Sequence, residues 1–207
     1  NTVQLNQVKS IQKVIATGAV SGVVVVGDID PDRAVDMVER QLSSRRYTPY
    51  AQSWKAPESW ESQLVLTPFE SQDRVGISVL LPGTTHSDAQ RWALKVAVLA
   101  MGGTFSSRLV GEIREKQGLA YSIGAHLKSY TGFGYIEISC TVSASESLAA
   151  IEAILTEVRR MKTNPLTPTE SISARRQLRQ QIFRRLSSPK GLSNSMASAL
   201  QNGSDID

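Results

Sequence analysis

The sequence lacks several features that would point directly to one class of protein. It has a single cysteine, Cys140, in 207 residues, which excludes an internal disulfide framework and gives no redox address. Its apolar runs are short, such as residues 23–26, which stop at Gly27, and all fall far below the roughly 18 residues that a membrane span needs. We therefore expect a folded domain with no membrane span.

Histidine is also scarce, with only His86 and His126 present. A catalytic zinc site needs three protein ligands and a carboxylate base beside the metal-bound water. Neither histidine belongs to an H-x-x-E-H motif, so we expect this chain to hold no metal. From the predicted elements we expect His86 in a turn before a helix and His126 on the face of a strand.

A group of aspartates and the single cysteine could suggest a cation site and a nucleophile, but both have simpler explanations. Asp28, Asp30 and Asp32 could suggest a cation site, but acidic residues at a helix start are favoured by the helix dipole. We interpret Cys140 as a buried small hydrophobe rather than a nucleophile, since apolar residues surround it in the sequence.

The charge balance is basic, with a net charge of +4. The excess is concentrated near the end of the chain, in Arg175, Arg176, Arg179, Arg184, Arg185 and Lys190. An apolar row with i, i+4 spacing runs through the same segment. This pattern fits the solvated face of an amphipathic helix or a surface for an acidic partner or subunit. No nucleic-acid-binding motif accompanies it, so we expect no nucleic acid partner.

Hydrophobic periodicity and turn residues predict the order of the elements. In chain order we expect a helix over 8–16, a strand over 20–27, a helix over 31–43, a loop over 45–62, strands over 63–69 and 74–81, helices over 87–101 and 106–116, strands over 120–130 and 133–142, and helices over 143–158 and 167–186. This order predicts an α+β fold, a layered domain with helices packed on one mostly antiparallel sheet.

Several helix starts carry capping signals. Asp30 precedes a proline at the first helical position, and Ser106 and Ser107 are further N-cap candidates. The predicted capping boxes pair Ser87 with Gln90, Ser143 with Glu146, and Thr167 with Glu170.

The chain reads as one domain followed by a short end segment. We expect residues 1–187 to form the domain and 188–207 to be a flexible tail or the start of a further segment. A first residue other than methionine suggests a piece excised or processed from a longer protein.

The most informative stretch is GGTFSSRL at 102–109 followed by REKQGLAY at 114–121. It places Arg114 and Tyr121 at the two ends of one helix-to-strand connection, where a cation and a phenol could converge on one peptide carbonyl. Alternatively, Arg114 pairs with Glu115 and Tyr121 is an ordinary strand residue. Gly118 would let the backbone turn sharply between them.

The two glycines at the start of this stretch have a structural explanation. Gly102 and Gly103 would allow a tight helix-to-helix turn and close packing rather than contact a substrate.

This stretch resembles the insulinase-like (pitrilysin-type, inverzincin) zinc metallopeptidases and the mitochondrial processing peptidases, in the domain that does not carry zinc. Three other segments resemble the same family in the right order: VVVVGDID at 23–30, the strand that ends in Pro-Gly at 74–83, and the Leu-Thr-x-x-Glu pattern at 166–170.

The resemblance implies a function. Such proteins are built as a clamshell of two related halves, with zinc in one half and an Arg–Tyr pair facing it from the other. The resemblance implies that Arg114 and Tyr121 contact the substrate carbonyl and stabilise the transition state. It also implies that Gly118 belongs to the substrate-binding segment.

The resemblance also implies the partners. No cofactor is expected in this chain; zinc is expected in the complementary half, upstream in the same polypeptide or on a partner subunit, in a homo- or heterodimer. The substrate would be a peptide or an unfolded protein, and the isolated chain would be inactive. The alternative is a non-catalytic scaffold, as in family relatives that are core subunits of respiratory complexes.

Overall fold

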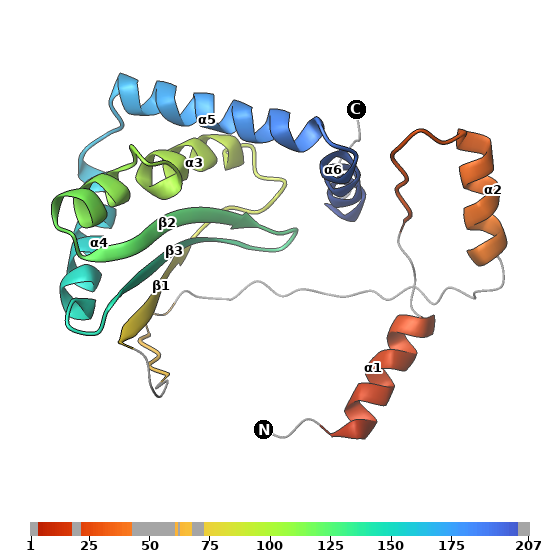
Figure 1. Ribbon diagram of the computed structural model, residues 1–207, viewed down its shortest axis with the longest axis horizontal. Helices are drawn as coiled ribbons and strands as arrows, with labels where there is room; N and C mark the ends of the chain where they lie inside the picture. Colours follow the sequence, from red (N-terminus) through yellow and green to blue (C-terminus); the bar gives the residue numbers. More distant parts are fainter. Residues whose placement is uncertain (1–3, 18–21, 43–60, 62, 68–72, 203–207) are drawn as a thin grey trace. The chain divides into compact units, whose positions relative to one another are not determined.

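The computed structural model describes residues 4–17, 22–42, 61, 63–67 and 73–202 (Figure 1). The chain divides into two compact units, one made of residues 55–182 and the other of residues 1–54 with 183–207. The predicted domain boundary at residue 187 stays a prediction.

The larger unit is built on a three-stranded antiparallel sheet. Its strands are β1 (Arg74–Pro82), β2 (Ala120–Ser129) and β3 (Gly134–Ser143), in the spatial order β1-β3-β2. β2 and β3 form the predicted hairpin, and β1 pairs with the other edge of β3. The predicted mostly antiparallel sheet is therefore confirmed.

Side chains alternate strictly along β3, which fixes the two faces of the sheet. Ile136, Ile138, Cys140 and Val142 are buried, while Ser139 between them and Ser143 after them are exposed. The buried row packs on helices, and the exposed row leaves the opposite face of the sheet open.

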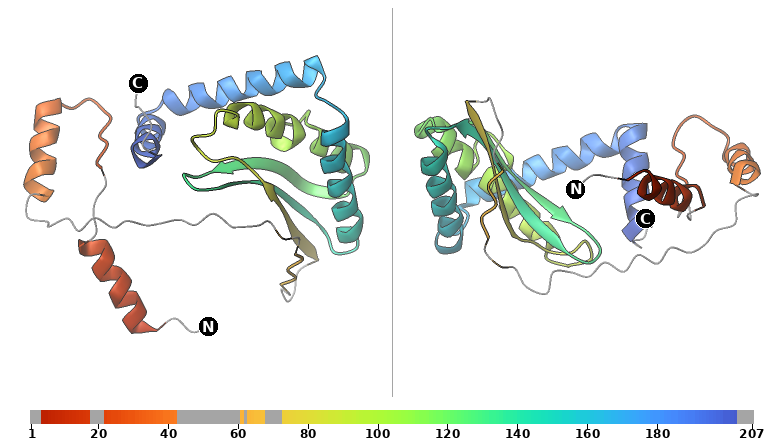
Figure 2. Two further views of the ribbon diagram at one scale, coloured as in Figure 1. Left: turned by 180° about the vertical axis from the view of Figure 1, so that it is seen from behind. Right: turned by 90° about the horizontal axis from the view of Figure 1, so that it is seen from below.

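Among the described residues of the larger unit, helices cover only the buried face of this sheet (Figure 1, Figure 2). They are α3 (Arg91–Val98), the π-helical segments η1 (Leu99–Gly103) and η2 (Val110–Lys116), α4 (Ser147–Thr163) and α5 (Pro168–Leu186). We call the other face, which presents Arg74, Gly76, Thr141 and Ser143, the open face of the sheet.

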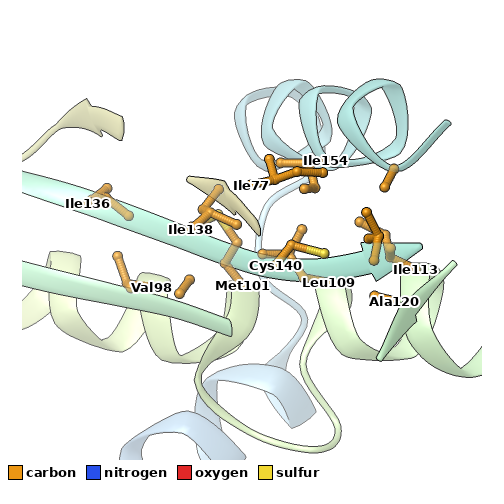
Figure 3. Packing of buried hydrophobic residues seen from close by; sticks show 13 residues of the cluster. Ile77, Val98, Met101, Leu109, Ile113, Ala120, Ile136, Ile138, Cys140 and Ile154 are labelled. Atoms are coloured by element: carbon orange, nitrogen blue, oxygen red, sulfur yellow. The ribbon is translucent and has the colours of Figure 1, made fainter. Parts of the chain in front are cut away.

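The main core joins all three strands to α4 and the helices before β2 (Figure 3). Its fully buried members include Leu109, Ile113, Ile138 and Ile154. Cys140 belongs to this core at 3% exposure, and burial raises the pKa of its thiol, so the interpretation as a buried hydrophobe is confirmed.

A second, smaller cluster attaches α5 as an outer layer. Ala174 and Leu178 of α5 pack against Leu99 and Ala100 of η1, on the side of that helix away from the sheet (Figure 1). The first three residues of the apolar row predicted from i, i+4 spacing, Ala174, Leu178 and Ile182, thus lie on the packed side of an amphipathic helix. The fourth, Leu186, is 49% exposed, and Arg175, Arg176 and Arg179 are exposed as well.

The smaller unit contains α1 (Leu5–Thr17), α2 (Pro31–Leu42) and α6 (Pro189–Asn202). The predicted N-cap is confirmed, because Oδ1 of Asp30 accepts a hydrogen bond from the backbone N–H of Arg33 at 2.9 Å. Helix α6 was not predicted, since its three serines, two asparagines and one glycine favour turns over helices.

Two predicted strands are wrong. Residues 22–26 and 63–67 contain no regular secondary structure, although both runs are rich in residues that favour strands. A strand needs a partner for its backbone hydrogen bonds, and within the described residues neither run pairs with another. The predicted loop over 45–62 lies outside the described residues except for Glu61.

Two of the predicted capping boxes are also wrong. The helices begin later than expected, at Arg91 and Ser147, and their N-cap residues Gln90 and Glu146 make no side-chain capping bond. Ser107 is no side-chain cap either: its hydroxyl donates to the backbone oxygen of Thr104 at 2.6 Å, and among the described residues no backbone N–H donates to its oxygen.

Within the described part of the chain, no helix combines the length and apolar character that crossing a membrane requires.

Candidate functional site

Tyr121 occupies an irregular position at the start of β2. The pairing with β3 steps from Ala120 opposite Val142 to Ser122 opposite Thr141, so Tyr121 is the extra residue of a β-bulge. A bulge re-aims the side chain it carries and is common next to active sites. The Tyr121 side chain is 70% exposed, and its hydroxyl makes no hydrogen bond to a described residue.

The Tyr121 ring contacts a cation that the sequence analysis did not identify. The guanidinium carbon of Arg74 lies 4.6 Å from the ring centroid, which is cation–π geometry. Arg74 begins β1 and pairs with Ser143 of β3. The contact therefore crosses the central strand of the sheet, and no local sequence pattern reports a pair separated in this way.

Arg114 lies in the last turn of η2 and is also accessible to solvent. Its Nε is 3.6 Å from a carboxylate oxygen of Glu115, and its guanidinium carbon is 6.0 Å from the ring centroid of Phe105. The predicted alternative pairing with Glu115 is therefore present. It is a loose ion pair with both side chains at least two fifths exposed, and such pairs contribute little to stability.

Gly118 turns the chain from the helix into β2. Its φ of 66° lies in the left-handed region, which costs a residue with a Cβ about 1–2 kcal/mol. The backbone N–H groups of Gln117 and Leu119 donate to the carbonyls of Glu112 and Ile113 at 3.1 and 3.0 Å. This resembles a Schellman end, one residue wider because the last turns are π-helical.

Arg108 ties the helix that carries Arg114 to the start of α5. Its Nε and Nη2 donate to the two carboxylate oxygens of Glu170 at 2.6 and 2.9 Å. Nη1 and Nη2 also donate to the backbone oxygens of Asn164 and Pro165 at 2.9 and 3.0 Å. The hydrogen bonds from Arg108 lower the pKa of Glu170 to about 2, with help from Thr167.

The same glutamate completes the one predicted capping box that is confirmed. Glu170 accepts from the backbone N–H of Thr167 at 2.7 Å, and the Thr167 hydroxyl accepts from the backbone N–H of Glu170 at 3.2 Å. Glu170 therefore serves the α5 cap and the Arg108 pair together. The capping role was predictable from sequence; the partner 62 residues away was not.

A polar pocket of about 440 Å³ surrounds this pair. Its wall contains Glu112, Lys116, Glu157 and Arg160, which form two further ion pairs. Because each of these charges already has a partner inside the pocket, the pocket offers no uncompensated charge to a ligand. Tyr121 and Arg114 are not part of its lining.

The two histidines do not come together. His86 precedes α3, where burial and nearby Arg91 lower the pKa of its imidazole, while His126 is exposed on β2. Among the residues that the structure describes, no three His, Cys, Asp or Glu side chains form a group able to hold a metal ion. These residues do not fit a zinc site.

The comparisons with known proteins agree with this architecture. Residues 2–178 match the family model described as the peptidase M16 inactive domain. An uncharacterized zinc protease of Rickettsia felis is 28% identical over 162 residues, which cover 77% of this chain and 38% of that protein.

Solved structures show the same fold. The peptidase M16 inactive domain from Pseudomonas fluorescens has a TM-score of 0.76 at 19% identity, covering 99% of this chain and 49% of that one. A chain of Complex III2 from Candida albicans, Inz-5 bound, has a TM-score of 0.70 at 16% identity, covering 87% of this chain and 45% of that one.

The chain spans less than half the length of these relatives. The predicted resemblance is confirmed by the family match over residues 2–178 and by the common fold. The chain belongs to the peptidase M16 inactive-domain family, the zinc-free half of zinc protease-like proteins.

Proposed function

We propose that this chain is the substrate-contacting half of a peptidase whose zinc is held by a complementary half. The observation that carries the proposal is the connection from η2 to β2. It presents an exposed guanidinium at Arg114 and an exposed phenol at the bulge residue Tyr121, on either side of a left-handed Gly118.

The chemistry proposed for these groups is electrostatic. The Tyr121 hydroxyl is a hydrogen-bond donor without an internal acceptor among the described residues, so it is free to donate to a peptide carbonyl. Such a donor is most effective when it is aimed at the oxygen that becomes negative in the transition state. Arg114 would hold an adjacent substrate carbonyl through its charged N–H donors.

The partner in this proposal is a zinc-bearing half, either upstream in the same polypeptide or on another subunit, in a homo- or heterodimer. Its zinc would supply the Lewis acid and the activated water. The substrate would be a peptide or unfolded protein. Strand addition at a sheet edge would hold its backbone without requiring a particular sequence.

A second candidate is a scaffold subunit without catalysis. The fold shared with a chain of Complex III2 from Candida albicans favours it, because the same architecture occurs there in a chain of a protein complex. The two candidates differ in whether Arg114 and Tyr121 affect peptide cleavage.

The first experiment is reconstitution. The purified chain alone should hold no stoichiometric zinc by elemental analysis and cleave no quenched fluorescent peptide. The same peptide should be cleaved once the zinc-bearing half is combined with the chain. One-to-one zinc in the pure chain, with cleavage that a chelator abolishes, would contradict the proposal.

Arg114→Ala in the assembled protein separates the two candidates. The peptidase account expects lower turnover and weaker apparent affinity, because a charged hydrogen-bond donor is lost. Arg176→Ala is the control, since it removes an exposed positive charge from α5. Normal cleavage by Arg114→Ala would favour the scaffold.

A further inference from the structure

We propose that Arg74 is a positioning residue for Tyr121: its guanidinium, stacked on the Tyr121 ring across the open face of the sheet, fixes the direction in which the phenol hydroxyl points. The inference rests on the proposed function, in which Tyr121 contacts the substrate.

The Tyr121 side chain has little of its surface covered by the rest of the protein. At 70% exposure its ring has little packing to select one rotamer, and an exposed side chain otherwise distributes among staggered wells. Within the described part of the chain, its hydroxyl makes no hydrogen bond, and a cation, the guanidinium of Arg74, lies 4.6 Å from its ring centroid. Arg74 is thus the group that restricts the ring.

The open face of the sheet leaves room for the contact between Arg74 and Tyr121. Arg74 and Tyr121 belong to the two edge strands, with β3 between them, so the side chains must span about 10 Å of sheet. Ser143 faces Arg74 on β3, and Gly76 is the next residue of β1 on the same face. A Cβ at Gly76 would meet no atom within 4 Å. Short side chains therefore leave the guanidinium an unobstructed path.

The positive charge of the Arg74 guanidinium also favours its contact with the ring. No described carboxylate forms an ion pair with Arg74, so its guanidinium is not drawn away from the ring. Arginine stacks on the face of an aromatic ring and keeps its N–H groups at the edge. Stacking on the face leaves the phenol oxygen uncovered. The contact can thus orient Tyr121 without consuming the donor that the proposed chemistry needs.

The test is a double-mutant cycle in the assembled, zinc-loaded protein. Arg74→Ala should lower kcat about two- to five-fold, the effect of losing an exposed cation–π contact, with KM unchanged. Arg74→Lys should retain more activity than Arg74→Ala, because it keeps a cation near the ring. Arg176→Ala controls for a lost surface charge.

The second arm of the cycle repeats Arg74→Ala in a Tyr121→Phe background, where the ring remains and the hydroxyl is absent. Arg74→Ala should then have no further effect on kcat, since there is no hydroxyl to orient. An equal loss in both backgrounds, or a change in KM alone, would mean that Arg74 acts on substrate directly and would overturn the inference.

A spectroscopic arm does not depend on cleavage. In arginine-labelled protein the Nε–H resonance of Arg74 should be shifted upfield by the Tyr121 ring current. The shift should persist in Tyr121→Phe and disappear in Tyr121→Ala. Absence of the shift, with Tyr121→Phe itself inactive, would overturn this inference and leave the proposed function standing. Full activity of Tyr121→Phe would overturn the proposed function and this inference with it.

Discussion

At the scale of single residues, Arg108 and Glu170 make the most heavily bonded contact beside the candidate site. The guanidinium uses four N–H···O bonds to join the helix that carries Arg114 to the cap of α5. Both side chains are less than a quarter exposed, and bidentate pairs of this kind are stronger than neutral hydrogen bonds. The pair therefore links the candidate site to the stability of α5.

This pair predicts a specific dependence of stability on pH. The pKa of Glu170 falls from 4.5 to about 2 in the folded state, so the stabilisation is complete above about pH 4.5 and is lost as the pH falls toward 2. Urea unfolding at pH 7 and pH 3 measures it. We expect Glu170→Gln to lower the free energy of unfolding by about 1.5–3 kcal/mol at pH 7.

The difference between wild type and Glu170→Gln should shrink at pH 3. The carboxyl of the unfolded chain, with its ordinary pKa of 4.5, is then mostly protonated, while the folded one, with a pKa of about 2, is still largely ionised, so proton uptake favours the unfolded state. Glu152→Gln, on the exposed side of α4, controls for a general change in charge. A gap between wild type and Glu170→Gln that stays constant from pH 7 to pH 3 would contradict the assigned cause of the low pKa.

At the scale of elements, the sequence correctly predicted helices that are stabilised by their own residues and strands that pair with the next strand along the chain. The hairpin of β2 and β3 follows from alternating residues around a turn at residues 131–132, and the α5 start follows from its capping box. The segments 22–26 and 63–67 carry equally strong local preferences, but a strand also needs a neighbouring strand, which composition does not reveal.

Helix starts show the same limit. A Ser followed three residues later by Gln or Glu has the right spacing at Ser87 and Ser143, but the helices begin a few residues further on. At Asp88 the side chain instead accepts from the backbone N–H of Gln90 at 2.7 Å. Local turns thus compete with the box for the same donors.

Helix-to-sheet packing gives a prediction with a matched control. A Cβ on Gly102 would lie 2.7 Å from Cβ of Ala125 and 2.8 Å from its backbone nitrogen. Gly102→Ala should therefore push η1 off β2 and lower the free energy of unfolding by about 1–3 kcal/mol. Chemical unfolding at neutral pH measures the change.

Gly111→Ala is the control, since a Cβ there meets nothing within 4 Å and Gly111 lies in η2. This substitution should be neutral or stabilise by up to about 1 kcal/mol, because alanine loses less backbone entropy in a helix. Equal destabilisation by both substitutions would contradict the close packing of η1 on β2.

At the scale of the whole molecule, the fold class and the family could be predicted, and the arrangement of the candidate site only in part. Arg114, Gly118 and Tyr121 are neighbours in sequence, so one stretch revealed them together. Their role as substrate contacts stays a prediction. Arg74, which stacks on Tyr121 from the opposite edge of the sheet, depends on strand order, and no sequence pattern identified it.

The central claim is that this zinc-free chain supplies the Tyr121 hydroxyl to peptide hydrolysis. The most direct measurement is kcat for cleavage of a quenched fluorescent peptide by the zinc-loaded assembly carrying Tyr121→Phe. Tyr130→Phe is the control, since it removes a phenol hydroxyl at the far end of the hairpin, where Tyr130 packs on Phe133 and Tyr135. Removal of one such donor costs about 2.7–4 kcal/mol of transition-state stabilisation. We predict that Tyr121→Phe lowers kcat by about 10²–10³ while Tyr130→Phe and folding are unaffected; near-normal kcat for Tyr121→Phe would contradict the account and favour a scaffold.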